Sequence, residues 1–137
     1  MKHPLEAAYI ATTYTAVTPE GFLALRIGES NAALDTLLTT GGVATWAYVT
    51  AYNPGSVQVS DEENEAHQRQ LREAVQECGY IFYEGAGIGQ NWPGEPSLLI
   101  LGMTETEAVA LGERFGQLAI VLGKLGGSAR LRWLERR

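Results

Sequence analysis

Apolar residues recur at helical spacing in three stretches of the chain, and each stretch follows a residue that can cap a helix. Before residues 61–78, Ser60 and Glu63 can bond each other's free backbone amides as a capping box. The apolar positions gather in the second half of this stretch, so its first half is expected to project into solvent. The other two predicted helices are a second capping-box segment at 104–116 and a shorter one that starts at Ser30 or Asn31 and ends at Gly41 and Gly42.

The other apolar stretches favour strands. Residues 97–101 form a continuous apolar run, which is typical of a central strand covered on both faces. Residues 22–28 and 44–52 alternate in character, as half-buried strands do. Gly126 and Gly127 separate two apolar segments and indicate a hairpin. The remaining predicted strands are 9–17, 80–84, 119–124 and 129–133.

The order of these elements predicts the fold class. Strands come in pairs at both ends of the chain, which implies antiparallel pairing, and the helices are too few for a doubly wound sheet. We therefore predict an α+β fold of two layers, with about three helices packed on a mainly antiparallel sheet. Residues 97–101 should be central, and helices 61–78 and 104–116 should share one face. The length of 137 residues predicts a single compact domain over 1–137.

Composition and net charge limit the kinds of partner that the protein is expected to bind. A hydrophobic fraction of 45% predicts a folded chain, and a net charge of −6 makes nucleic acid an unlikely partner. Apolar runs are short and no signal peptide is recognisable, so we expect a cytoplasmic protein without a membrane segment. Residues 124–137 instead carry a net charge of +4. This segment is either a solvated tail or a docking site for an acidic partner or a phosphate.

Residues for several common chemistries are scarce. The single cysteine, Cys78, cannot form an internal disulfide and is expected to be a packed core thiol. With only His3 and His67 beside it, no metal site and no cofactor are expected. His67 has no evident nucleophilic partner and is expected at the surface. Whether the protein is an enzyme therefore stays open.

Polar residues crowd the exit of the predicted strand 44–52 and give the first candidate site. Asn53 precedes Pro54, which should hold it in an extended conformation, and it could present its amide to a ligand. Ser56 could add its hydroxyl. The alternative is a turn in which Asn53 bonds its own backbone.

Glu95 lies between Gly94 and Pro96, just before the most apolar strand, so helix capping does not explain it. A carboxylate there could act as a general base or bind a hydroxyl or an amine. The alternative is a surface carboxylate or a structural ion pair. If the site hypothesis holds, replacing Asn53 or Glu95 with alanine should remove binding and leave the fold intact.

Two further candidates are Arg26 and Gln117. Arg26 points away from the apolar side of its strand and could grip a carboxylate or phosphate, or it could form a structural ion pair. Gln117 follows the end of a helix and could cap it or reach a pocket. Residues 85–89, rich in glycine, lack the helix that a dinucleotide loop must open. We expect residues 85–94 to form a mobile loop, with a lid over a ligand as the alternative.

Several of these segments together resemble a bacterial family, domain of unknown function 3293. The resemblance covers most of the chain, and its most specific elements are Asn-Pro-x-Ser and Phe-Gly-Gln in this order. It rests on Tyr9-x-x-Thr12-x-Tyr14, Thr50-Ala51-Tyr52-Asn53-Pro54-x-Ser56, Asn64, Gly85-x-Gly87, Trp92-x-x-Glu95-x-Ser97 and Phe115-Gly116-Gln117-x-Ala119. It implies one compact domain and adds no activity.

Three hypotheses of function remain, of which an enzyme that uses Glu95 as a base ranks third. The first is a domain that binds a small polar or anionic metabolite, possibly a nucleotide-like one, through Arg26, Asn53, Ser56, Glu95 and Gln117. The second is a protein-interaction module, binding a partner or a second copy, that uses exposed aromatic residues or the basic segment 124–137. Its aromatic candidates are Tyr14, Trp46, Tyr48 and Trp92. Convergence of Arg26, Asn53, Glu95 and Gln117 on one site would favour the first.

Overall fold

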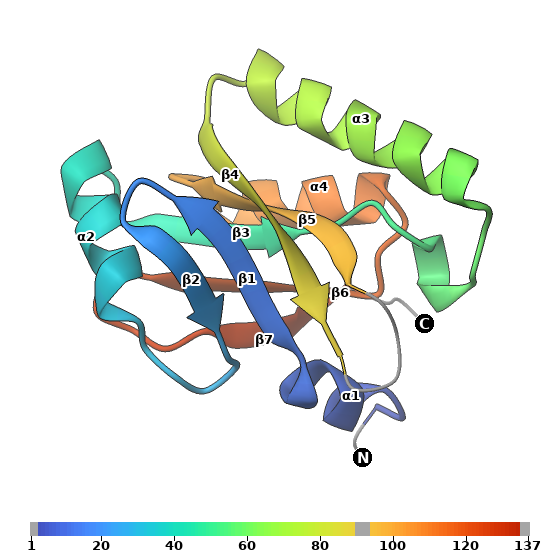
Figure 1. The fold of residues 1–137 in the computed structure, drawn as a ribbon, viewed down its shortest axis with the longest axis horizontal. Helices are drawn as coiled ribbons and strands as arrows, with labels where there is room; N and C mark the ends of the chain where they lie inside the picture. The colour runs from blue at the N-terminus through green and yellow to red at the C-terminus, as the bar shows by residue number, and fades with distance from the viewer. Residues whose placement is uncertain (1–2, 90–93, 135–137) are drawn as a thin grey trace.

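The computed structural model describes residues 3–89 and 94–134, in which four α-helices and seven strands alternate along the chain (Figure 1). The helices are α1 (Glu6–Ala11), α2 (Ala32–Gly41), α3 (Asp61–Glu77) and α4 (Glu105–Arg114). The strands are β1 (Thr13–Thr18), β2 (Gly21–Leu25), β3 (Thr45–Val49), β4 (Ile81–Ile88), β5 (Glu95–Leu101), β6 (Ala119–Lys124) and β7 (Arg130–Trp133). None of the helices in these residues is long and apolar enough to span a membrane.

All seven strands belong to one sheet in the order β2-β1-β4-β5-β3-β6-β7, and every pair of neighbours is antiparallel. The predicted α+β class, the antiparallel pairing and the central place of β5 are therefore confirmed. The two edges of the sheet approach each other, since Ile27 and Ala129 form a parallel bridge. The Gly28 amide donates to the Ala129 carbonyl at 2.8 Å. The sheet is thus curled, with an inner and an outer face.

The curl creates two separate hydrophobic cores. On the inner face, Tyr48 and Leu99 pack with Leu38 of α2. On the outer face, Ile100 packs with Leu71 of α3 and with α4. Helices α3 and α4 share one face, as predicted, but α2 lies on the other, so helices cover both faces of the sheet and the architecture departs from the two layers that were predicted. Figure 1 shows α3 and α4 along one side of the sheet and α2 at the end away from α1.

The N-terminal segment is the second correction. A strand was expected over 9–17, but residues 6–11 form α1 and the strand begins at Thr13. Alanine-rich residues favour the helix, and the β-branched residues that follow favour the strand. The Thr12 side chain marks the boundary, because its hydroxyl donates to the Ala8 carbonyl at 2.7 Å.

The glycine-rich stretch is the third correction. Gly85 to Ile88 continue β4: residues 85–87 pair with β5, and Gly87 and Ile88 pair with β1, so this part is not a loop. Residues 90–93, which belong to the expected mobile loop, lie outside the described residues. Gly85 is required by close packing: a Cβ there would lie 1.7 Å from the Thr15 carbonyl oxygen. The absence of a side chain lets β1 pass directly over β4.

Burial also departs from expectation at several residues. Cys78 is exposed rather than packed in the core. Three of the four aromatic residues proposed as an exposed interaction surface, Tyr14, Trp46 and Tyr48, are buried in the inner core. The fourth, Trp92, lies outside the described residues. The alternation of large and small residues in 44–52 could have predicted this burial, because the large side chains point to one face of the sheet and that face is covered.

Candidate functional site

Asn53 and Glu95 meet where β3 ends and β5 begins. The last paired residue of β3, Val49, is in register with Leu98 of β5. Beyond it, the Thr50 hydroxyl donates to the Pro96 carbonyl at 2.7 Å and keeps the two chains together. The Asn53 side-chain amide then donates to the Glu95 carboxylate at 3.2 Å. Two residues that are 42 positions apart thus form one polar contact.

Asn53 adopts a left-handed conformation with φ 46°, not the extended one expected before a proline. Such a backbone is unfavourable for most residues but is tolerated by asparagine, whose side chain can bond nearby backbone groups. The bonds are present here: Asn53 Oδ1 accepts from the Val59 amide at 3.1 Å, and the Asn53 carbonyl accepts from the Ser56 amide at 2.8 Å. The local turn proposed as the alternative role of Asn53 therefore exists, in addition to its contact with Glu95.

Helix α3 holds this turn from the other side through two buried amides. Asn64 makes two bonds to Asn53: its Oδ1 accepts from the Asn53 amide at 2.7 Å, and its Nδ2 donates to Asn53 Oδ1 at 2.9 Å. One turn later, Gln68 accepts from the Ala51 amide at 3.0 Å. Both side chains are buried, so the first half of this helix does not simply project into solvent as expected. Asn64 and Gln68 are four positions apart and lie on the same helix face as Leu71. This spacing was the signal in the sequence that could have predicted their burial.

The Glu95 carboxyl is half-buried, and burial raises its pKa above the ordinary value of 4.5. The bond from Asn53 stabilises the charged form and offsets part of that shift. The negative charge of Glu95 also affects the pKa values of two tyrosines, Tyr9 and Tyr52. The pKa of Tyr9 is raised by burial and, to a smaller extent, by Glu95, and the pKa of Tyr52 is raised by its partial burial and by Glu65, Asp61 and Glu95.

Tyr9 and Ser56 complete the polar cluster. The Ser56 side chain lies beside the Tyr9 phenol and counteracts the rise in the Tyr9 pKa. Tyr9 is held in place by a T-shaped contact with Trp133, with the ring centroids 5.4 Å apart, and by Tyr14, whose hydroxyl donates to the Tyr9 carbonyl at 2.8 Å. We name Tyr9, Asn53, Ser56 and Glu95 the Glu95 cluster. Sequence reasoning placed Tyr9 in a strand and so did not include it among the site residues.

Gln117 stabilises the loop that contains Asn53, and its side chain bonds backbone carbonyls rather than the side chains of the cluster. Its amide donates to the Tyr52 carbonyl at 3.2 Å and to the Phe115 carbonyl at 3.3 Å. It thereby ties the end of α4 to the residue before Asn53. The Gly55 amide adds a second tie, donating to the Gly116 carbonyl at 2.7 Å. Gln117 thus lies beside the Glu95 cluster and holds it in position.

Arg26 lies apart from the other predicted residues. Glu95 is in register with Gly87, Gly87 with Tyr14, and Tyr14 with Leu25, so these residues share one face of the sheet. Arg26 follows Leu25 and points to the opposite face, where it donates to the Ile10 carbonyl at 3.2 Å. The structure therefore brings Asn53, Ser56, Glu95 and Gln117 together and leaves Arg26 out.

Comparison with known protein families assigns the chain to a family. Residues 49–120 match the family model DUF3293, a family of proteins of unknown function. The chain belongs to this family. The matched segment contains Asn53, Ser56, Glu95 and Gln117, whereas Tyr9 precedes it. No curated protein and no solved structure matches the chain. The DUF3293 assignment therefore confirms the resemblance and leaves the chemistry to be argued from the Glu95 cluster.

The raised pKa of Glu95 predicts a specific dependence of stability on pH. Between about 4.5 and the higher pKa of the folded state, the folded protein retains a proton that the unfolded chain has lost. The contribution of Glu95 is thus fully present at acidic pH and is lost as the pH rises through this window. We expect Glu95→Gln, which cannot ionise, to gain stability relative to wild type over the same window. Urea denaturation of both proteins at a series of pH values measures this difference in the free energy of unfolding. The contributions of Asp61 and Glu65 cancel, because both proteins contain these residues. A difference that does not change with pH would contradict the raised pKa.

Proposed function

We propose that the protein binds a small polar molecule at the Glu95 cluster, with Glu95 as the main recognition group. The observation that supports this most strongly is a half-buried carboxyl with a raised pKa and no cationic partner among the described residues. Perturbed carboxyls of this kind concentrate at binding and catalytic sites. A left-handed Asn53 beside it is a second feature typical of such sites.

The chemistry of the cluster favours a ligand that donates hydrogen bonds. Glu95 has one carboxylate oxygen engaged by Asn53, and its other oxygen has no hydrogen bond within the described residues. The Tyr9 and Ser56 hydroxyls can each donate or accept. The charges that raise the pKa of Tyr52 are those of Glu65, Asp61 and Glu95, and this acidic surrounding favours an amine, an amide or a hydroxyl over an anion. For a nucleotide-like ligand, we expect the base or the ribose, rather than the phosphate, to face Glu95.

A thermal-shift screen of amines, amino acids and nucleosides tests this proposal. A ligand at about 100 times its Kd stabilises the protein by about 2.7 kcal/mol, which raises the melting temperature by several degrees. We expect Glu95→Gln to lose that shift. Glu84→Gln is the matched control, because Glu84 is an exposed carboxylate on the neighbouring strand β4 and pairs with Arg72. A shift that survives in Glu95→Gln, or a wild type that responds to no compound, would contradict the proposal.

The same raised pKa favours a second candidate, proton transfer to or from a bound substrate by Glu95. A compound from the screen that is also consumed over time, and is stable in the presence of Glu95→Gln, would identify this enzyme function. The alternative of a protein-interaction module has less support. Three of its aromatic candidates, Tyr14, Trp46 and Tyr48, are buried.

A further inference from the structure

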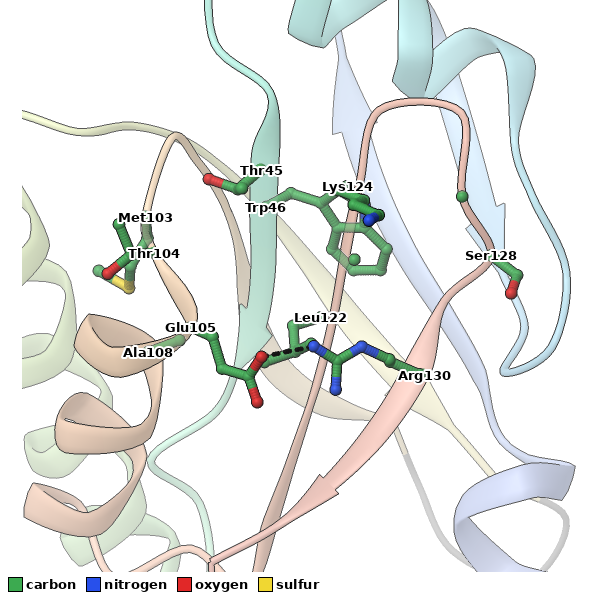
Figure 2. A pocket seen from close by; sticks show the side chains of 12 residues that line it. Thr45, Trp46, Met103, Thr104, Glu105, Ala108, Leu122, Lys124, Ser128 and Arg130 are labelled. Atoms are coloured by element: carbon green, nitrogen blue, oxygen red, sulfur yellow. Dashed lines mark hydrogen bonds and ion pairs between the residues drawn. The ribbon is translucent and has the colours of Figure 1, made fainter.

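A cavity of about 460 Å³ lies at the other end of β3 from the Glu95 cluster. Figure 2 shows it between the start of α4 and the hairpin of β6 and β7. Its size falls within the usual range for small-molecule sites. Thr45 and Lys124, which line it, form the first pair of the β3–β6 register, whereas Asn53 follows the other end of β3. The two sites therefore do not share residues.

The floor of the cavity is apolar and includes a buried indole. Met103, Ala108 and Leu122 contribute aliphatic surface, and Trp46 contributes its ring. Trp46 is 3% exposed, and its indole nitrogen lies against Gly123, where a Cβ would come within 2.8 Å of it.

The rim is basic in an otherwise acidic protein. Lys124 and Arg130 line the cavity, and Arg132 follows on the same strand as Arg130. Two carboxylates lie near these cations: Glu105 pairs with both Arg130 and Arg132, and Asp35 accepts from the Gly126 amide of the hairpin at 3.0 Å. Figure 2 shows the bond between Glu105 at the start of α4 and Arg130 on β7, which spans the two elements. One carboxylate thus serves two guanidinium groups, and Lys124 adds a further positive charge.

We propose that this cavity binds an amphipathic anion: an aromatic or aliphatic body on the Trp46–Leu122 floor, and a carboxylate, sulfonate or phosphate held by Lys124 and Arg130. Charge complementarity selects the anion, because Lys124, Arg130 and Arg132 outnumber the carboxylates of Glu105 and Asp35. Glu105 competes with the ligand for the arginines. The site accounts for the basic segment of the sequence, which the Glu95 cluster does not use.

Anilinonaphthalene sulfonate is a suitable probe, since it joins an aromatic body to one anionic group and its fluorescence reports burial. We expect saturable binding at one site on the folded protein. Lys124→Gln and Arg130→Gln should each weaken it by about tenfold, the effect of losing one charged hydrogen bond. Glu105→Gln should strengthen it, because it frees both arginines. Phenylnaphthylamine, which lacks the sulfonate, should bind without responding to these three substitutions.

The exposed pair Val17 and Phe22 on the β1–β2 hairpin is the control for nonspecific apolar binding. Replacing both with threonine should leave the affinity for the probe unchanged. All these side chains are exposed, so the variants should retain the wild-type melting temperature. The proposal is overturned if the probe does not saturate, if Lys124→Gln and Arg130→Gln bind it as wild type does, or if the loss of Val17 and Phe22 abolishes binding.

Discussion

Gly85→Ala should lower the free energy of unfolding by more than about 4 kcal/mol, or prevent folding altogether. The added Cβ would lie 1.7 Å from the Thr15 carbonyl oxygen and 2.7 Å from the Ala16 Cα, so it meets backbone and not a flexible side chain. Relief would require β1 to move. The Thr15 hydroxyl bonds both backbone groups of Ala86, and the Thr15 carbonyl accepts from the buried Tyr48 hydroxyl at 2.8 Å. These bonds would be lost with the movement.

Gly87→Ala is the matched control, two residues further along the same strand. A Cβ there would meet Thr12 and Tyr14 at 3.7 Å, which is ordinary van der Waals contact. We expect a change of less than about 1 kcal/mol in the free energy of unfolding. Chemical denaturation of the two variants side by side measures the contrast. Equal stability of Gly85→Ala and Gly87→Ala would show that β1 does not cross β4 at Gly85.

Asn53→Ala should lower the free energy of unfolding by about 3 kcal/mol, and the melting temperature by about 10 °C. The substitution leaves the Val59 amide and the Asn64 side chain without the Asn53 oxygen that they share, and it removes the donor to Glu95. Alanine also tolerates the left-handed backbone less well than asparagine. The sequence-based expectation that this variant would leave the fold intact is therefore revised, and Glu95→Gln becomes the cleaner test of binding.

Asn53→Gly separates the two causes, because glycine accepts a φ of 46° without strain. We expect it to lose the side-chain bonds but to remain about 1 kcal/mol more stable than Asn53→Ala. Thermal melts of both variants measure this. A loss below about 0.5 kcal/mol in Asn53→Ala, as expected of a surface residue, would contradict the hydrogen-bond network around Asn53.

The elements that the sequence predicts well are those with local signals. Both capping boxes form as expected, because each needs only residues three positions apart. The continuous apolar run of β5 indicated its central position. The extension of β4 through Gly85 was missed, because the reason for that glycine is the backbone of Thr15, a contact 70 residues away in the sequence. From the local sequence alone, such a glycine predicts the end of a strand.

The arrangement of the candidate site likewise could not be predicted from local pattern, because it depends on the register between strands that are distant in the sequence. Asn53 and Glu95 were each singled out by their position beside a strand, but their contact follows from the pairing of β3 with β5. The alternation around Arg26 correctly indicated that it faces away from Leu25. The sequence could not indicate that Glu95 shares the face of Leu25, since this requires the registers of β1, β4 and β5. Arg26 was therefore grouped with residues on the other side of the sheet.

Amide chemical-shift mapping with a compound from the thermal-shift screen is the most direct test of the Glu95 cluster as the binding site. At saturation, we predict the largest changes at Tyr9, Asn53, Ser56 and Glu95, and little change at Lys124 or Arg26. The four residues come from three separate segments of the chain, so a shared response would locate the ligand where those segments meet. Largest changes around Thr45 and Lys124, or around Arg26, with Asn53 and Glu95 unaffected, would contradict the proposed function.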